Sequence, residues 1–508
     1  MKLPIHRDPI PEAVLQARFI RAKILQDPSR PAVHFCSPEG TLNDANGLIY
    51  HAGRYHMFYL SRTPIPDAEG KLDERWVEVW DHVSSRDLIH WVHHPVALEP
   101  ATDGSTPLGI WSGDAIEGAP VPTLIYHVPG QGACVAQSVD PDLDTWTPFP
   151  ENPVIPLAQE GDEYISFDTT GWYSDGVCFL LVGNRSKAPG HEEGDGSSLF
   201  TSTDLKNWEY QGPFYQSRRE WTPVELDCAC PDVFPFGDEH MLLMHGHKPI
   251  FHVHYYLGKL KDRHFEPRLH ARMSGEGSGL AAPETWLDDQ GRRIMIGWIR
   301  PPGVFFADWE KTGWSSTMSL PRVLEPDAEH GVRMYPVPEL QSLRGSEISL
   351  PSTEVKDGER IALPALNGKL LEIEAEFLPG ETQQLGLEVL CSGDGQERTV
   401  VEVDLVKGVL RGCYAQSSVG ETPDYSVLDP EHAGSHELPF ILGENETLRL
   451  QIFVDRSVVE VFANERQCLV LQVYPSLPDS EQVYVFARGG DVELKSLSAW
   501  PLDRVNPW

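Results

Sequence analysis

Positive charge is scarce in this sequence. Lys and Arg together number 41 against 76 Asp and Glu, which gives a formal net charge of −35 at pH 7. A surface of this sign repels polyanions instead of releasing counterions from them. We therefore expect no nucleic acid and no anionic membrane among the partners. A small neutral carbohydrate remains suitable, because sugars are bound through short-range hydrogen bonds and aromatic faces.

Long apolar runs are also absent. No stretch approaches the roughly 20 apolar residues of a membrane helix. Residues 1–32 interleave charged and apolar residues at helical spacing, without an apolar run of signal-peptide length. The eight cysteines are scattered and lack the dense spacing of a disulfide scaffold. These absences predict a reduced, cytoplasmic protein with a helical extension over residues 1–32.

A repeated unit fills the first two thirds of the sequence. Each copy has an acidic residue, an apolar strand, a turn and a second strand, and the copies recur about 60 residues apart on average. Their acidic residues are Asp44, Asp114, Asp168, Asp232 and Glu284. Strand repeats of this kind are typical of propeller blades. We predict a five-bladed β-propeller over residues 33–325, with the five carboxylates converging at one end of its axis. The alternative is that the acids only cap turns.

The pattern changes after residue 325. A Pro-rich passage over 326–350 is predicted as a linker. Residues 351–508 contain segments such as KLLEIEAEF and RLQIFVDRSVVEVFAN, which alternate apolar and polar residues as half-buried antiparallel strands do. The predicted fold is therefore all-β, with a five-bladed β-propeller followed by a C-terminal β-sandwich.

Several segments, taken in order, resemble glycoside hydrolase family 32, the invertases and fructan hydrolases. LNDANG is similar to the family's WMNDPNG, IWSGDA to its WSGS, and IFVDRSVVEVFAN to its sandwich motif FVDRSSVEVF. The resemblance covers nearly the whole chain. It implies a retaining glycosidase, in which one carboxylate is the nucleophile and a protonated carboxyl about 5 Å away is the acid.

The resemblance assigns roles to two of the acids. Asp44 matches the family's nucleophile, and its neighbour Asn43 is predicted to bind substrate. The alternative for Asp44 is an Asx-turn that begins a hairpin. Asp168 matches the Asp that hydrogen-bonds the sugar hydroxyls and stabilises the transition state, although Phe167 and Thr169 replace the family's Arg and Pro.

The third family motif is altered. The family has Glu-Cys-Pro-Asp, with that Glu as acid/base, whereas this sequence has Ala229 at the position of the Glu. Loss of the acid should lower the rate by about 10² to 10⁴. Residues 225, 227 and 229 share a face in an extended chain because side chains alternate. Asp227 is the candidate acid/base, Glu225 is the second candidate, and the absence of any catalyst is the third possibility.

Other side chains in matching segments are predicted to bind substrate. They are Trp80, Trp111, Asp114, Asp232, Glu284 and Trp314. Tryptophan faces pack against the apolar side of sugar rings, but tryptophan also packs between blades. Asp232 has the alternative role of beginning its blade. Because Ala45 and Leu60 replace a Pro and a Gln of the family, another fructoside, an arabinofuranoside or a substituted sugar is an alternative to sucrose.

Two His-x-His pairs stand in the segment HMLLMHGHKPIFHVHYY. They are His245 with His247 and His252 with His254. On strands each pair lies on one face, and paired imidazoles can hold zinc. The resemblance implies no catalytic metal, however, so we predict a polar strand face, no metal and no other cofactor.

These observations predict a retaining, exo-acting β-fructofuranosidase that releases terminal fructosyl or related furanosyl units from sucrose or fructo-oligosaccharides. Two alternatives stay open, a non-catalytic sugar-binding relative that lost its acid/base and a fructosyltransferase. We expect a monomer or a homodimer.

Overall fold

The computed structural model describes residues 12–24, 26–38, 40–66, 72–100, 109–159, 161–164, 166–184, 194–218, 220–223, 226–247, 252–275, 278–300, 312–420 and 434–505. Regular structure in these ranges is almost entirely β-strand. The α-helix α1 (Glu12–Ile24) and the short 3-10 helix η1 (Pro338–Leu343) are the exceptions. No helix within these ranges combines the length and the apolar character needed to cross a membrane.

Five strand sets, each an antiparallel meander of four strands, make up the N-terminal part, and a parallel pairing of residues 116–117 with 171–172 joins the second and third sets into one sheet. The first set is β1 (Gly40–His51), β2 (Arg54–Pro66), β3 (Leu72–Ser85) and β4 (Trp91–His93). The second is β5 (Gly113–Glu117), β6 (Thr123–Val128), β7 (Gly132–Gln137) and β8 (Thr147–Pro148). The third is β10 (Thr169–Ser174), β11 (Val177–Val182), β12 (Ser197–Ser202) and β13 (Glu209–Tyr215).

The fourth set is β14 (Ala229–Phe236), β15 (Glu239–Gly246), β16 (His252–Lys261) and β17 (His264–Arg272). The fifth is β18 (Leu280–Leu287), β19 (Arg293–Ile299), β22 (Arg322–Asp327) and β23 (Gly331–Pro336). Three short strands add to these sets: β9 (Ile155–Pro156) pairs with β7, β20 (Trp314–Ser315) with β1, and β21 (Thr317–Met318) with β19.

The first strand of each set is here called its inner strand. The inner strands contact one another in succession, from β1 to β5, β10, β14 and β18, and β18 contacts β1. The repeated unit of the sequence corresponds to the first two strands of a set. Its turns follow local chemistry, as in the Asp175-Gly176 turn between β10 and β11, where both residues have positive φ and match a two-residue hairpin turn.

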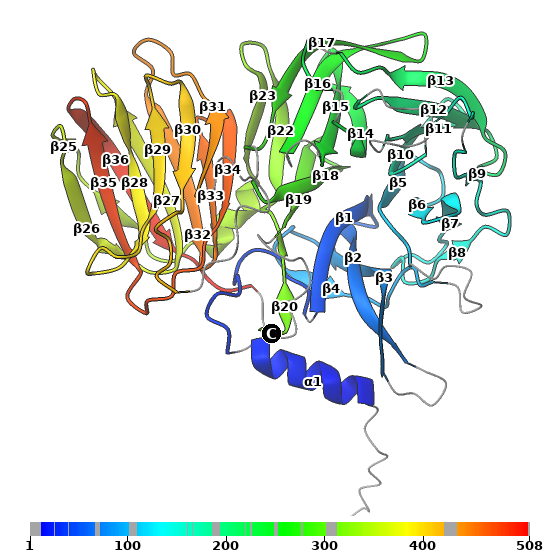
Figure 1. The fold of residues 1–508 in the computed structure, drawn as a ribbon, viewed down its shortest axis with the longest axis horizontal. Coiled ribbons are helices and arrows are strands. Elements are labelled where there is room, and N and C mark those ends of the chain that lie inside the picture. The colour runs from blue at the N-terminus through cyan, green and yellow to red at the C-terminus, as the bar shows by residue number, and fades with distance from the viewer. Residues whose placement is uncertain are drawn as a thin grey trace, which may run out of the picture.

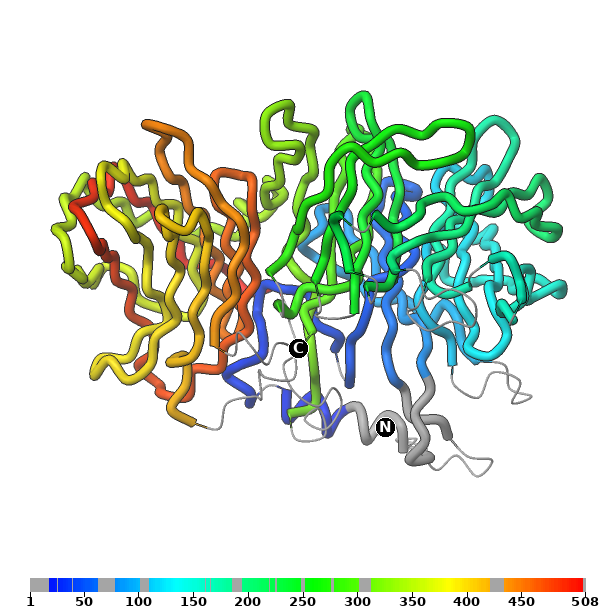
Figure 2. Tube along the Cα trace, turned by 45° about the horizontal axis from the view of Figure 1, so that its top comes forward, coloured from blue at the N-terminus to red at the C-terminus, as the bar shows by residue number. Residues whose placement is uncertain are grey.

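Two further sheets make up the C-terminal part. One has the order β24-β36-β27-β32-β33-β34, with β25 also paired to β36, and the other has the order β26-β35-β28-β29-β30-β31. Apolar residues of both sheets, such as Ile373, Ile452, Leu387 and Val485, pack into one shared core. Figures 1 and 2 show these strands, coloured yellow to red, beside the fifth strand set.

The bounds of these C-terminal strands are β24 (Ile348–Leu350), β25 (Thr353–Val355), β26 (Arg360–Asn367), β27 (Leu370–Leu378), β28 (Gln384–Cys391), β29 (Thr399–Asp404), β30 (Val409–Cys413), β31 (Ser435–Pro439), β32 (Leu448–Asp455), β33 (Val458–Ala463), β34 (Gln467–Gln472), β35 (Gln482–Arg488) and β36 (Val492–Pro501).

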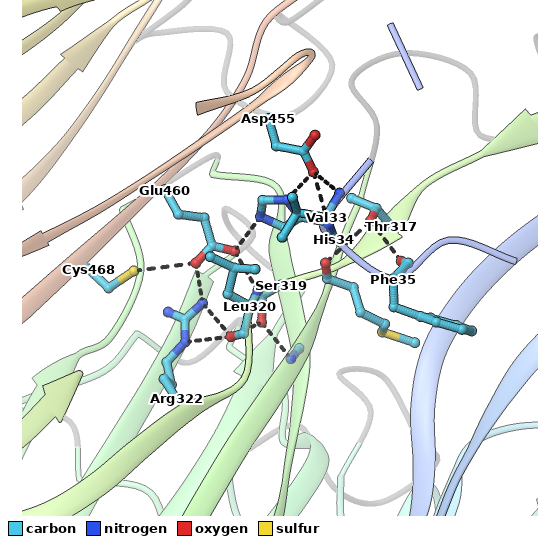
Figure 3. Close-up of polar contacts among 12 residues, drawn as sticks. Val33, His34, Phe35, Thr317, Ser319, Leu320, Arg322, Asp455, Glu460 and Cys468 are labelled. Carbon is cyan, nitrogen blue, oxygen red and sulfur yellow. Dashed lines mark hydrogen bonds and ion pairs between the residues drawn. The ribbon is translucent and has the colours of Figure 1, made fainter. Parts of the chain in front are cut away.

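The segment FVDRSVVEVF joins the two parts. Asp455, at the end of β32, accepts hydrogen bonds from the backbone N–H groups of residues 32–34 and contacts His34 Nδ1 at 2.8 Å. Glu460, in β33, lies 3.3 Å from His34 Nε2 and accepts from Arg322 Nη2 at 2.7 Å. Figure 3 shows these four side chains together. All four are buried, so two cations and two carboxylates neutralise each other at the contact between the parts.

Candidate active site

The five acids of the repeat lie in or directly before the five inner strands. Asp44 is in β1, Asp114 in β5, Asp168 just before β10, Asp232 in β14 and Glu284 in β18. Burial raises the pKa of Glu284 well above its usual value, and the charges of the other four acids add to the effect. The five carboxylates are therefore close enough to interact, as the spacing of the repeat predicts.

Hydrogen bonds to these acids connect consecutive inner strands. Ser112 Oγ, preceding β5, donates to Asp44 at 2.7 Å, and Thr170 Oγ1 in β10 donates to Asp114 at 2.8 Å. The backbone N–H of Cys230 in β14 donates to Asp168 at 3.1 Å, and Thr285 Oγ1 in β18 donates to Asp232 at 2.6 Å. Each of these four acids thus accepts from the next inner strand or from the residue just before it. The recurring acid has a structural function as well as a place near the axis.

Asp44 and Asp168 flank the same cysteine. Cys230 Sγ lies 3.8 Å from Asp44 Oδ2 and 3.5 Å from Asp168 Oδ2. Burial and then the charge of Asp44 raise the pKa of Asp168 to about 6. Burial also raises the pKa of Asp44, and this effect is opposed by the hydrogen bond from Ser112 and by the charge of His247. The Asp44 residue as a whole is only half-buried.

Asp114 and Asp232 belong to a second group of charges. Burial raises the pKa of both, that of Asp232 to about 6, and Arg293 opposes the shift of Asp232. Arg293 makes a bidentate contact with Glu117 at 2.6 and 3.1 Å and also donates to Thr285. The predicted substrate-binding roles of Asp114, Asp232 and Glu284 stay predictions, and the structure adds the strand-connecting bonds of Asp114 and Asp232.

The altered third motif lies at the hairpin of β14 and β15. Ala229 is fully buried and pairs with His245. Asp227 is 2% exposed. Its Oδ1 accepts from the backbone N–H of His247 at 2.7 Å, and its Oδ2 lies 3.0 Å from His247 Nδ1. Both oxygens of the first acid/base candidate therefore contact one histidine. The second candidate, Glu225, lies outside the described residues.

His247 was not among the predicted site residues, but it contacts Asp227 through both its backbone N–H and its ring. The hydrogen bond and charge of Asp227, and the charges of Asp168 and Asp44, raise the pKa of His247 against the opposing effect of burial. His247 in turn opposes the upward shifts in pKa of Asp44 and Asp168. The feature of the sequence that could have indicated His247 is the pair His245-x-His247, because His245 pairs with Ala229 and His247 contacts Asp227.

The predicted tryptophans have different surroundings. Trp80 is fully buried, and its indole N–H donates to the carbonyl of Trp111, which is itself half-buried. Trp314 packs with Ile20 and Ile24 of α1, and its Nε1 donates to Asp27 at 2.7 Å. Asn43, beside Asp44, has a buried side-chain oxygen without a hydrogen-bond partner among the described residues. The binding roles of these residues stay predictions.

One group of possible metal ligands lies apart from the five acids. Among the described residues, the ligand atoms of His82, His94 and Asp144 lie within 4.8 Å of one another. His94 Nδ1 contacts Asp144 directly at 2.6 Å. All eight cysteines are free thiols.

Comparison with known proteins covers nearly the whole chain. Residues 34–336 match the family model "Glycosyl hydrolases family 32 N-terminal domain", and residues 339–501 match "Glycosyl hydrolases family 32 C terminal". A fructan 6-exohydrolase of Beta vulgaris is 27% identical over 94% of this chain and 88% of its own. A levanase of Bacillus subtilis is 28% identical over 94% of this chain and 71% of its own. The crystal structure of fructan 1-exohydrolase IIa from Cichorium intybus aligns with a TM-score of 0.80, at 21% identity, over 94% of this chain and 98% of that one.

Proposed function

Because the chain belongs to glycoside hydrolase family 32 and is a glycosidase, we propose that it is a retaining, exo-acting β-fructofuranosidase. In this proposal it releases terminal fructosyl units from sucrose or fructo-oligosaccharides. The observation that carries the proposal is the pair Asp44 and Asp168, which flank Cys230 among five interacting carboxylates. The substrates named for the related exohydrolase and levanase support a fructosyl glycone.

The two acids have separate functions in this proposal. Asp44 attacks the anomeric carbon and forms a covalent glycosyl-enzyme, which water then hydrolyses. Ser112 donates to the Asp44 carboxylate and helps to keep it ionised. Asp168, more deeply buried, accepts hydrogen bonds from sugar hydroxyls and stabilises the positive charge of the oxocarbenium-like transition state. Asn43, whose buried side-chain oxygen has no hydrogen-bond partner among the described residues, is proposed to bind a further hydroxyl.

The proposed architecture is a five-bladed propeller with a C-terminal sandwich. The succession of contacts from β1 through β18 and back to β1 supports closure into a ring. The fifth strand set extends to Pro336, since β22 and β23 complete it, and the C-terminal sheet begins with β24, which pairs with β36. The proposed propeller is therefore 33–336 instead of 33–325, and the proposed sandwich begins at 348 instead of 351. The N-terminal extension over 1–32 is kept, and the linker is 337–347 instead of 326–350. In this arrangement each blade contributes one carboxylate near the axis.

The second candidate function is sugar binding without catalysis. Ala229 favours it, because the carboxyl that protonates the leaving group in the family is missing there. A fructosyltransferase is a third candidate and differs only in the acceptor that reaches the covalent intermediate.

The proposal is tested by chromatography of the free sugar released from sucrose, inulin- and levan-type oligosaccharides and arabinofuranosides. We expect fructose from at least one substrate. Asp44→Asn should lower kcat by about 10⁴ or more, because the loss of a nucleophile removes the covalent route. The matched control is Asp238→Asn, which changes an exposed turn aspartate and should retain activity.

Two results would contradict the proposal. Full activity of Asp44→Asn would exclude this nucleophile. The absence of release from every member of the panel, together with sugar binding measured by titration calorimetry, would favour the non-catalytic relative.

A further inference from the structure

Retaining hydrolysis requires a proton donor that Ala229 cannot provide. Ala229 is buried against its partner strand, and its methyl group has no exchangeable proton. If the proposed function is correct, another group near Asp44 must protonate the leaving oxygen and later deprotonate water.

The hairpin of β14 and β15 brings a histidine to this place. Ala229 pairs with His245 in an antiparallel register, so the residues opposite each other two positions further along are Asp227 and His247. The bond from the His247 backbone N–H to Asp227 Oδ1, at 2.7 Å, fits this continuation. Since side chains two positions apart in an extended chain share a face, His247, which directly follows β15, is expected on the same side as His245, next to the missing carboxyl.

The side chain of His247 contacts Asp227 through one nitrogen and is partly exposed. Its Nδ1 lies 3.0 Å from Asp227 Oδ2, and the side-chain exposures are 35% for His247 and 3% for Asp227. A buried carboxylate on one ring nitrogen fixes the tautomer, so that the proton in transit is carried by Nε2, and it stabilises the imidazolium. The pair therefore has the features of an oriented acid/base.

We propose that His247, positioned by Asp227, is the general acid/base that replaces the carboxyl missing at Ala229. Three carboxylates act on it: Asp227 from the segment before β14, Asp44 from β1 and Asp168 from the segment before β10. On its own strand, the ring of His245 lies 4.6 Å away, centroid to centroid. Burial keeps the pKa of His245 well below the usual value, so His245 is neutral.

The step balances without any further reactant. An oxygen lone pair of Asp44 forms a bond to the anomeric carbon. The bond from that carbon to the leaving oxygen breaks, its electron pair goes to the oxygen, and the oxygen takes the proton from Nε2 of the His247 imidazolium. Water then attacks the anomeric carbon and gives a proton to the neutral imidazole, while the ester electron pair returns to Asp44.

Asp227 acts through His247 in this assignment and is a positioning residue. Both of its oxygens contact His247, and its side chain is almost without exposure. Its negative charge favours the imidazolium, which must be protonated before the glycosidic bond breaks.

The test compares two substrates that carry the same glycone, the one released in the sugar panel. One has a methanol leaving group, which needs protonation, and the other has a para-nitrophenol leaving group, which does not. His247→Gln should lower kcat/KM for the methyl glycoside by about 10² to 10⁴, but for the aryl glycoside by less than about 10-fold. His240→Gln, in β15 and half-buried, is the matched control and should leave both rates unchanged. Circular dichroism checks that each variant is folded.

A second readout follows the covalent intermediate. With the aryl glycoside, His247→Gln should accumulate glycosyl-enzyme, because water lacks its base, and intact mass spectrometry should detect one added glycosyl unit. The additional change Asp44→Asn should abolish that mass. Azide, a nucleophile that needs no base, should restore turnover of the aryl glycoside.

Asp227→Asn separates a positioning residue from a direct acid. If His247 is the acid, activity falls as pH rises through its pKa, and removal of the Asp227 charge moves this alkaline limb to lower pH. Equal losses of His247→Gln on both glycosides, or none, would overturn the inference. The inference would also be overturned if Asp227→Asn, but not His247→Gln, lowered kcat/KM more for the methyl glycoside than for the aryl glycoside. In either case, if Asp44→Asn still abolishes sugar release, the proposed function is unaffected.

Discussion

Carboxylates at equivalent places in the repeat differ in what surrounds their oxygens. Asp114 and Asp232 accept short bonds from the threonines of neighbouring strands. Glu284 has a buried oxygen, Oε2, without a partner among the described residues. An unpartnered buried carboxyl is stable only in its neutral form. The protonation state of each buried acid therefore depends on the hydrogen bonds that its carboxyl group accepts.

This difference leads to a prediction for Glu284→Gln. Burial and four neighbouring acids hold the pKa of Glu284 well above 4.5. As pH rises above 4.5, Glu284 ionises in the unfolded chain before it ionises in the folded protein. The free energy of unfolding of the parent protein therefore falls. Gln cannot ionise and avoids this loss. Above pH 5 we expect the variant to be more stable by roughly 1 kcal/mol or more, as measured by urea unfolding.

The control for this variant is Glu329→Gln, at an exposed turn position, which should change stability little at any pH. A variant at 284 that is less stable than the parent at pH 7 would mean that the Glu284 carboxyl is ionised and well solvated in the native state.

At the residue scale, the sequence predicted the interacting acids but not the histidine beside them. The spacing of Asp44 through Glu284 reflects a repeat, and a repeat is visible in sequence. His247 depends on register instead. A bulge between Ala229 and Asp232, with Cys230 at φ 42°, shifts the pairing by one residue. A one-residue shift changes the face on which every following side chain lies, and no sequence pattern indicated this bulge.

At the scale of elements, the end of β11 supports the segment that carries Asp227. The N–H of Gly183 donates to the carbonyl of Asp168, and the N–H of Cys228 donates to the carbonyl of Asn184. A Cβ at Gly183 would lie 2.1 Å from the carbonyl oxygen of Cys228. The missing side chain thus allows two backbones to approach closely at the edge of the site.

We predict that Gly183→Ala lowers both stability and activity. The new methyl group would displace the Cys228 backbone and with it the neighbouring Asp227, at a cost of about 1 to 3 kcal/mol. Thermal unfolding and the rate of sugar release measure the two effects. Gly443→Ala is the control, because the nearest atom to its Cβ is the end of the flexible Glu446 side chain. Unchanged activity of Gly183→Ala would show that the segment adjusts independently.

The strands themselves were largely predictable from alternation and turn residues. The segments KLLEIEAEF and RLQIFVDRSVVEVFAN correspond to β27, β32 and β33. The function of the FVDRSVVEVF motif was not predictable in this way. Its carboxylates bind groups more than 130 residues away, His34 and Arg322, and such partners are determined only by the complete fold.

At the scale of the whole molecule, the cluster between the two parts makes stability depend on pH. Burial is the largest single influence on the pKa of His34 and lowers it, but the hydrogen bonds and charges of Asp455 and Glu460 together outweigh burial and raise this pKa from 6.5 to about 9. A raised pKa means that the stabilisation is complete below pH 6.5 and is lost as pH rises towards 9. The pKa values of Asp455 and Glu460 are lowered in spite of burial, through His34 and Arg322, so stabilisation from these acids is lost at acidic pH.

We predict that His34→Gln lowers the free energy of unfolding by about 3 to 5 kcal/mol at pH 6.5, because it leaves buried carboxylates without one cation. The difference from the parent should shrink towards pH 9, where the parent loses the same charge. Urea unfolding at both pH values measures this, with His264→Gln, at an exposed position, as control. A difference independent of pH would mean that His34 is neutral in the native state.

The bonds between Asp455 and residues 32–34 also impose an order in time. These partners are separated by 421 to 423 positions, and a ribosome adds about 5 to 20 residues per second. The amides of residues 32–34 therefore leave the ribosome roughly 20 to 80 seconds before their acceptor exists. During translation the N-terminal sheets therefore lack this contact, and it can form only after β32 has been synthesised.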